Sequence, residues 1–163
     1  MPPAPLCPCT SGLRYRACCG RYHAGEAEAP DAEALMRSRY SAFALREVAY
    51  LWRTLHPEHP DRARPEADFL REVRARATAL KYPRLHILDR RLAEPGGTAV
   101  VLFHARVFES GRDVSFVERS EFQHDGTGWR YLRGESATPR ALSVPPESLT
   151  LETFAASAPR GDG

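Results

Sequence analysis

The sequence has little net charge, no long apolar run and no export signal at its N-terminus. Lysine and arginine number 23 against 21 aspartate and glutamate residues, so net charge alone predicts neither a nucleic-acid nor an anionic-membrane partner. No segment approaches the roughly 20 consecutive apolar residues that cross a bilayer. The start, MPPAPLCPCTSG, lacks the charged and apolar stretches of a secretory signal. We therefore expect a cytoplasmic protein in a reducing compartment, where cysteines more often bind metal than form disulfides.

The chain divides by composition into four parts. With 163 residues, 42% hydrophobic and 27% charged, it has room for one folded domain and a short accessory module. None of the four cysteines lies beyond position 19, so residues 1–24 form a local motif. The small, polar residues 25–30 are predicted to be a linker and residues 31–134 the main domain. Residues 135–163, rich in Ser, Pro, Ala and Thr, are predicted to be a flexible tail.

The hydrophobic period of the main domain changes from 3.6 to 2 after Pro83. Helical spacing predicts helices over residues 32–45, 47–55 and 66–80, the first capped by Asp31. Alternating residues then predict strands over 84–94, 98–109, 113–124 and 129–133, joined by glycine-bearing hairpins. This order of elements indicates an α+β domain with an antiparallel meander.

The four cysteines have the spacing of a zinc site. Cys7-Pro8-Cys9 and Cys18-Cys19 form two close pairs, eight residues apart, and two such pairs supply four tetrahedral ligands without a larger fold. The alternatives are free or redox-active thiols, or crossed disulfides between the pairs. His23 is a candidate to replace one cysteine. Three arginines surround the cluster and either offset its negative charge or contact phosphate: Arg14, Arg16 and Arg21.

These residues resemble known motifs. CPCTSGLRYRACCG is similar to the SEC-C zinc motif, which usually has glycine where this chain has Thr10, and lysine where it has Leu13. A glycine at that first position can serve a positive φ, which a β-branched residue resists. Three further segments resemble the YchJ-like family of bacterial proteins: LMRSRYSAF (35–43), TLHP (54–57) and VERSEF (117–122). The resemblance implies a SEC-C motif followed by an NTF2-like cone, in which three helices pack into the concave side of a curved antiparallel sheet.

Such a cone predicts inward polar groups. We expect six of them to converge as pocket candidates: Arg37, Arg39, Tyr40, His56, Glu118 and Ser120. In the first interpretation, Glu118 pairs with Arg37 or Arg39 and closes the cone. In the second, the same groups line a small-molecule pocket. In the third, Glu118 is the base and His56 the acid of an enzyme.

The functional expectation is a zinc-binding, non-catalytic interaction or scaffold module. The resemblance implies a protein partner for the zinc motif, because SEC-C motifs elsewhere act as small recognition elements, including contact with a secretion chaperone. The alternative is a small-molecule-binding or catalytic NTF2-like domain. A third hypothesis, nucleic-acid binding through the three arginines, predicts affinity that falls steeply with salt. No catalytic residue is predicted.

Overall fold

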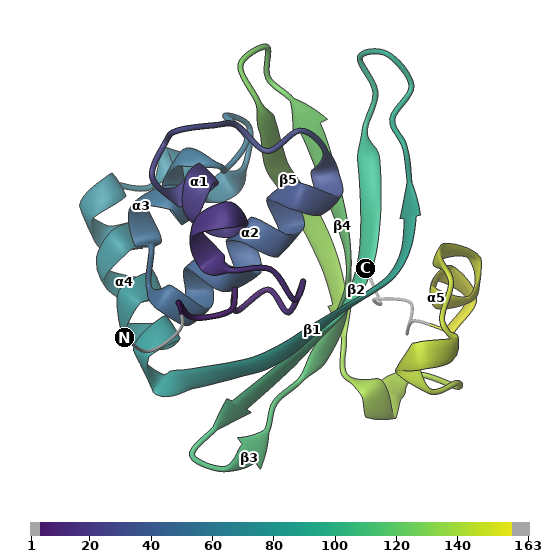
Figure 1. The fold of residues 1–163 in the computed structure, drawn as a ribbon. Helices are drawn as coiled ribbons and strands as arrows, with labels where there is room; N and C mark the ends of the chain where they lie inside the picture. Colours follow the sequence, from purple (N-terminus) through teal and green to yellow (C-terminus); the bar gives the residue numbers. More distant parts are fainter. Residues whose placement is uncertain (1–3, 158–163) are drawn as a thin grey trace.

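A computed structural model describes residues 4–157 and has the predicted α+β architecture (Figure 1). The helices are α1 (Cys19–His23), α2 (Ala32–Leu45), α3 (Val48–Arg53), α4 (Glu66–Ala79) and α5 (Leu151–Ser157). The strands are β1 (Leu80–Arg91), β2 (Ala99–Glu109), β3 (Arg112–Asp113), β4 (Phe116–His124) and β5 (Trp129–Ala137). The three predicted helices of the main domain correspond to α2, α3 and α4.

The sheet is an antiparallel meander. Its order is β1-β2-β4-β5, and the short β3 pairs with β2. Figure 1 shows the long strands curving around α1 to α4, which lie on one side of the sheet. β1 begins four residues before its predicted start and includes Pro83, at a register shift between Lys81 and Arg84. A proline is tolerated there because β1 is an edge strand, where a missing N–H removes no ladder hydrogen bond.

Helix α2 is the central helix of the concave side. The Asp31 side chain accepts a hydrogen bond from the Ala34 backbone at 2.8 Å, as the predicted N-cap should. The helix packs against both β1 and β2, and Leu35 is fully buried in the same core cluster as the sheet residues Val101 and Phe122. This packing fixes the direction of every polar side chain that α2 carries.

The predicted flexible tail needs correction. β5 continues to Ala137, and the segment after it ends in α5, on the side of the sheet opposite α2 (Figure 1). Leu149 and Phe154 are 2% and 1% exposed and pack against Leu102 and Val117 of the sheet. The apolar positions of LTLETF thus cover an apolar sheet face. Residues 158–163, also predicted to belong to the tail, lie outside the described residues.

No helix within residues 4–157 is long and apolar enough to cross a membrane.

Candidate functional site

The first site is built by the N-terminal segment, here called the knuckle (residues 5–23). A bridge between Leu6 and Arg14 and a hydrogen bond of 2.8 Å from Cys7 N to Leu13 O close a small hairpin that presents Cys7 and Cys9. Cys18 and Cys19 follow at the start of α1. Gly20 is required there, because a Cβ at this position would lie 2.8 Å from the Tyr15 carbonyl oxygen.

The hairpin and helix bring the four thiols together. Their Sγ atoms all lie within 4.8 Å of one another, and all four cysteines are unbonded. The Sγ of Cys18 lies 3.6 Å from that of Cys9 and 3.9 Å from that of Cys19. A tetrahedral site with zinc–sulfur bonds of about 2.3 Å requires sulfur separations of about 3.8 Å. The donor set and its dimensions therefore fit a tetrahedral thiolate-binding metal.

The four thiols lie close enough to change one another's pKa values. Hydrogen bonds with Cys19 and then Cys7 hold the pKa of the Cys9 thiol far below its usual range. The contacts with Cys7 and then Cys9 raise the pKa of Cys19 far above its usual range. A bound cation removes this conflict, because it stabilises every thiolate at once.

His23 is committed elsewhere, so it does not act as a fifth ligand candidate. Its Nδ1 lies 2.6 Å from the Tyr15 hydroxyl, and its Nε2 lies 2.8 Å from the Ser38 carbonyl oxygen. A carbonyl only accepts, so Nε2 carries the proton and Nδ1 accepts from Tyr15. His23 joins α1 to α2, and no ring nitrogen is left for a metal.

The knuckle is fastened to the main domain at two further points. Arg37 of α2 donates to the Cys9 carbonyl at 3.2 Å. Thr10 has a φ of 62°, the positive value expected where the motif usually has glycine. Its hydroxyl donates to the Leu85 carbonyl at 3.0 Å and accepts from the Leu85 amide at 3.3 Å. Hydrogen bonds to the edge strand β1 thus offset the strain that a threonine has at a positive φ, where a glycine would have none.

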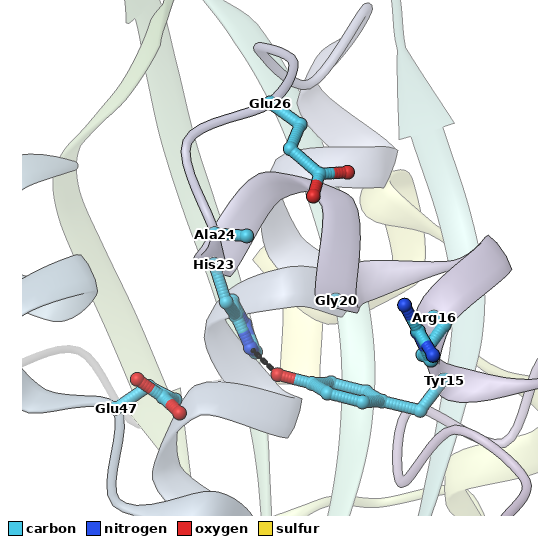
Figure 2. Close-up of a pocket in the computed structure, with 7 residues that line it drawn as sticks. All are labelled: Tyr15, Arg16, Gly20, His23, Ala24, Glu26 and Glu47. Carbon is cyan, nitrogen blue, oxygen red and sulfur yellow. Dashed lines mark hydrogen bonds between the residues drawn. The ribbon is translucent and has the colours of Figure 1, made fainter.

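An open cleft of about 510 Å³ lies beside the knuckle, where it meets the turn between α2 and α3. Figure 2 shows the Tyr15–His23 hydrogen bond within this cleft, with Glu47 facing it from the main domain. Burial is the main cause that raises the pKa of Tyr15 to about 12, with the charge of Glu47 adding to it. Tyr15 is therefore a neutral hydrogen-bond donor at physiological pH.

The second site is a cavity between α2, α4 and the sheet, with two adjoining lobes. The inner lobe, about 160 Å³, extends to Glu118, and the outer lobe, about 350 Å³, extends to His59 and Asp61. Six residues line both lobes: Arg39, Phe43, Tyr82, Val107, Phe116 and Tyr131. The cone therefore has a packed core and, beside it, open space lined by these residues.

Arg39 is the buried charge of this cavity, at 7% exposure. Its Nη1 donates to the Leu51 carbonyl at 3.0 Å and to the Thr54 hydroxyl at 2.7 Å. Its guanidinium lies over the Tyr131 ring, 4.8 Å from the centroid. Burial lowers the pKa of Arg39 from its usual value, which reflects the cost of holding a cation away from water.

Glu118 forms a hydrogen-bonded network in place of the predicted ion pair. Within residues 4–157 no arginine lies within 4.0 Å of its carboxylate; Ser120 and Tyr131 both donate to its Oε2, the latter at 3.2 Å. Burial raises the pKa of Glu118 above its usual value, although these hydrogen bonds oppose the rise. The interpretation in which Glu118 pairs with Arg37 or Arg39 is therefore wrong.

Three of the six pocket candidates line neither lobe: Arg37, His56 and Ser120, the last of which is fully buried and donates to Glu118. Arg37 faces the knuckle, and the His56 ring accepts from the Glu58 amide at 3.1 Å without lining either lobe. Tyr40, by contrast, lines the inner lobe and donates to the Arg106 carbonyl at 3.1 Å. His59 and Asp61, which sequence reasoning missed, line the outer lobe instead.

Comparison with known proteins places the chain in a family. A sequence model described as "YchJ, middle NTF2-like domain" matches residues 31–134. The chain is 37% identical over 129 residues to a UPF0225 protein of Enterobacter sp. (strain 638), covering 79% of this chain and 82% of the relative. The chain belongs to the YchJ-like family. A UPF0225 protein of Streptomyces avermitilis is 45% identical to this YchJ-like chain over 130 residues, covering 79% and 83% of the two.

Solved structures of SEC-C motif-containing proteins share the YchJ-like fold described above. The solution structure of such a protein from Rhodopseudomonas palustris is 35% identical, with a TM-score of 0.69, and the match covers 80% of this chain and 98% of that one. A crystal structure from Psychrobacter arcticus, at 23% identity and a TM-score of 0.66, covers 87% and 89% of the two chains and matches in fold.

Proposed function

We propose that the four cysteines hold one zinc ion and that the metal-bound knuckle is a protein-interaction element on an NTF2-like scaffold. The observation that supports the zinc assignment is the gathering of four thiols whose Sγ atoms all lie within 4.8 Å of one another, two of the pairs at 3.6 and 3.9 Å. Zinc held by four cysteines has no open position, so its role is structural rather than catalytic. Cys7, Cys9 and Cys19 are buried, which favours a metal that stays with the folded protein.

Native mass spectrometry with elemental analysis tests the zinc assignment. We expect one zinc per chain in the purified protein and none in Cys19→Ser. The matched control is Ser11→Ala, because the Ser11 hydroxyl lies 3.3 Å from the Cys18 Sγ but supplies no ligand. A metal-free wild-type protein with an ordered knuckle would contradict the assignment.

The interaction role is supported by the knuckle's outer surface. Leu6 and Leu13 are 59% and 55% exposed on the hairpin, and the exposed Arg14 and Arg16 follow them in the chain. Large apolar side chains left in water beside cations suit a partner that offers apolar and acidic groups. We propose that this surface, made of Leu6, Leu13, Arg14 and Arg16, binds a protein.

Quantitative affinity purification from producing cells tests this role. Leu6→Ser combined with Leu13→Ser should release proteins that the wild type retains, with zinc content unchanged. Leu92→Ser is the matched control, since Leu92 is 79% exposed in a distant part of the chain. The same retained proteins for the wild type, the double variant and the control would refute the role. Retention that nuclease removes and added salt weakens steeply would instead indicate RNA bound through the arginines.

The cavity supports a second function, small-molecule binding. The specific observation is that Arg39 and Glu118 line open space instead of neutralising each other. The outer lobe, at about 350 Å³, has the size of sites that enclose small ligands. The predicted general acid His56 lies outside the lobes, so the residues favour binding over the acid–base enzyme.

A further inference from the structure

Arg39 offers an unused hydrogen-bonding edge to the cavity. Its Nη1 is occupied by Leu51 and Thr54, whereas Nε and Nη2 have no partner among residues 4–157. The contacts on Nη1 and the stacking on Tyr131 hold the guanidinium still. A fixed fork of two N–H donors matches the two oxygens of a carboxylate.

The guanidinium also lacks a direct counter-charge. No carboxylate within the described part of the chain lies within 4.0 Å of Arg39. Asp61 lines the outer lobe, but it lies 3.6 Å from Arg64 and 3.9 Å from the His59 ring. A buried charge without an ion-pair partner is costly, so an incoming anion gains most at this position. Arg76, exposed and also lining the outer lobe, adds positive charge to the entrance.

The inner lobe defines the rest of the ligand. Its walls include Phe43, Phe103 and Phe116, and its volume is about 160 Å³. An engineered apolar cavity of about 150 Å³ takes up benzene, so this lobe accommodates one aromatic ring. Glu118 lines the inner lobe and not the outer one. Its carboxylate therefore repels an anionic group of a ligand from the inner lobe.

We propose that the cavity binds a small aromatic monocarboxylate, with the carboxylate on the Nε–Nη2 edge of Arg39 and the ring in the inner lobe. This inference rests on the small-molecule function proposed above and names its ligand class. Recognition requires both halves of the molecule: the anion gains from Arg39, and the ring fills apolar space that holds water poorly.

The test is a titration of the isotope-labelled full chain, followed by amide NMR shifts. The probes are phenylacetate and 3-phenylpropionate, their amides, and acetate as a carboxylate without a ring. We expect the aromatic carboxylates to shift the amides of Ala105 and Val107, which line the inner lobe. They should bind at least tenfold more tightly than the amides or acetate.

Variants locate the site. Arg39→Lys keeps the charge but loses the fork, and it should weaken carboxylate binding at least tenfold. Ala105→Leu fills the inner lobe and leaves Arg39 in place, so carboxylate binding should fall in this variant too. It tests the site independently should Arg39→Lys fail to fold. Arg74→Gln is the matched control, because Arg74 lies on α4, is exposed and lines neither lobe.

The outcomes separate the two proposals. If the phenylacetate and 3-phenylpropionate amides, or acetate, bind in the cavity as tightly as the aromatic carboxylates, the ligand class is wrong while small-molecule binding stands. If no probe shifts the backbone amide signals of Ala105 and Val107 at millimolar concentration, the ligand class is overturned. If neutral ring compounds do not shift them either, the small-molecule function is overturned as well.

Discussion

Removing the proposed zinc ion should destabilise the main domain without unfolding it, because Tyr22 is the one residue of the knuckle that belongs to the main core within residues 4–157. Three sets of hydrogen bonds depend on the knuckle's shape: Thr10 with Leu85, Arg37 with the Cys9 carbonyl, and His23 with the Ser38 carbonyl. Each contributes about 1 kcal/mol to the free energy of unfolding. Tyr22 of α1, buried at 7% exposure, adds about 2 kcal/mol. The expected loss is therefore about 5 kcal/mol.

The size of the loss sets the thermal shift. At about 2–4 °C per kcal/mol for a chain of this length, Tm should fall by about 10–20 °C. The domain should stay folded at room temperature, because the buried residues of α2, α3 and the sheet, such as Leu35, Leu51 and Phe122, belong to a core cluster separate from the one that contains the cysteines. Most of the far-UV circular dichroism should survive.

Differential scanning calorimetry and circular dichroism measure both quantities before and after chelation, with elemental analysis of the same samples. A chelator already saturated with zinc controls for effects of the chelator itself. An unchanged Tm in zinc-free protein would refute the reasoning, since the fastening contacts would then not need the metal. Loss of the whole cooperative transition would refute it equally, by showing that the domain has no stable core of its own.

Three further predictions concern single residues. Thr10→Val keeps the strained φ but loses both hydrogen bonds to Leu85, so denaturant unfolding should show a loss of about 1 kcal/mol in the free energy of unfolding. Thr10→Gly, which relieves the strain, should stay closer to wild type, and the reverse order would be contrary evidence. Phe154→Ala should lower the free energy of unfolding by about 3–5 kcal/mol, and Glu152→Ala, at an exposed position of α5, should hardly change it. Equal, small effects would mean that α5 does not pack against the sheet. Because the pKa of Glu118 is raised in the folded protein, the free energy of unfolding should fall as pH rises above the ordinary value of 4.5. Glu118→Gln should lessen that fall in unfolding experiments at several pH values, whereas parallel pH profiles of the variant and the wild type would exclude this role of Glu118.

Local sequence patterns were sufficient for α2, α3 and α4 and for the order of the four long strands. Asp31 predicts the start of α2 because the capping side chain and the helix it caps are adjacent in sequence. Pro83 misled the prediction of β1, because a proline usually ends an element and only the edge position of β1 makes it harmless. That position depends on contacts between distant parts of the chain, which no local pattern contains.

The tail was mispredicted for a related reason. Its composition favours disorder, and its apolar residues are few, but Val100 and Leu102 on the outer face of β2 are fully buried. The run AVVLF therefore carried a signal that both faces of β2 are covered. His59 was missed because it lies in a loop between α3 and α4, where no hydrophobic period indicates direction.

The cysteine cluster was predictable because its spacing is local, whereas the six-residue pocket was not, because Arg37 and Arg39 were assigned to one direction. Residues two apart on a helix differ by about 200°, so α2 sends Arg37 to the knuckle and Arg39 to the cavity. Ser38 between them accepts from His23 through its carbonyl and contacts the Tyr50 hydroxyl at 2.6 Å through its own hydroxyl. α2 is thus the shared wall of both sites. Any shift of α2 caused by loss of the knuckle moves Arg39 as well, so removal of the proposed zinc ion should weaken the proposed carboxylate binding even though no cysteine lines the cavity.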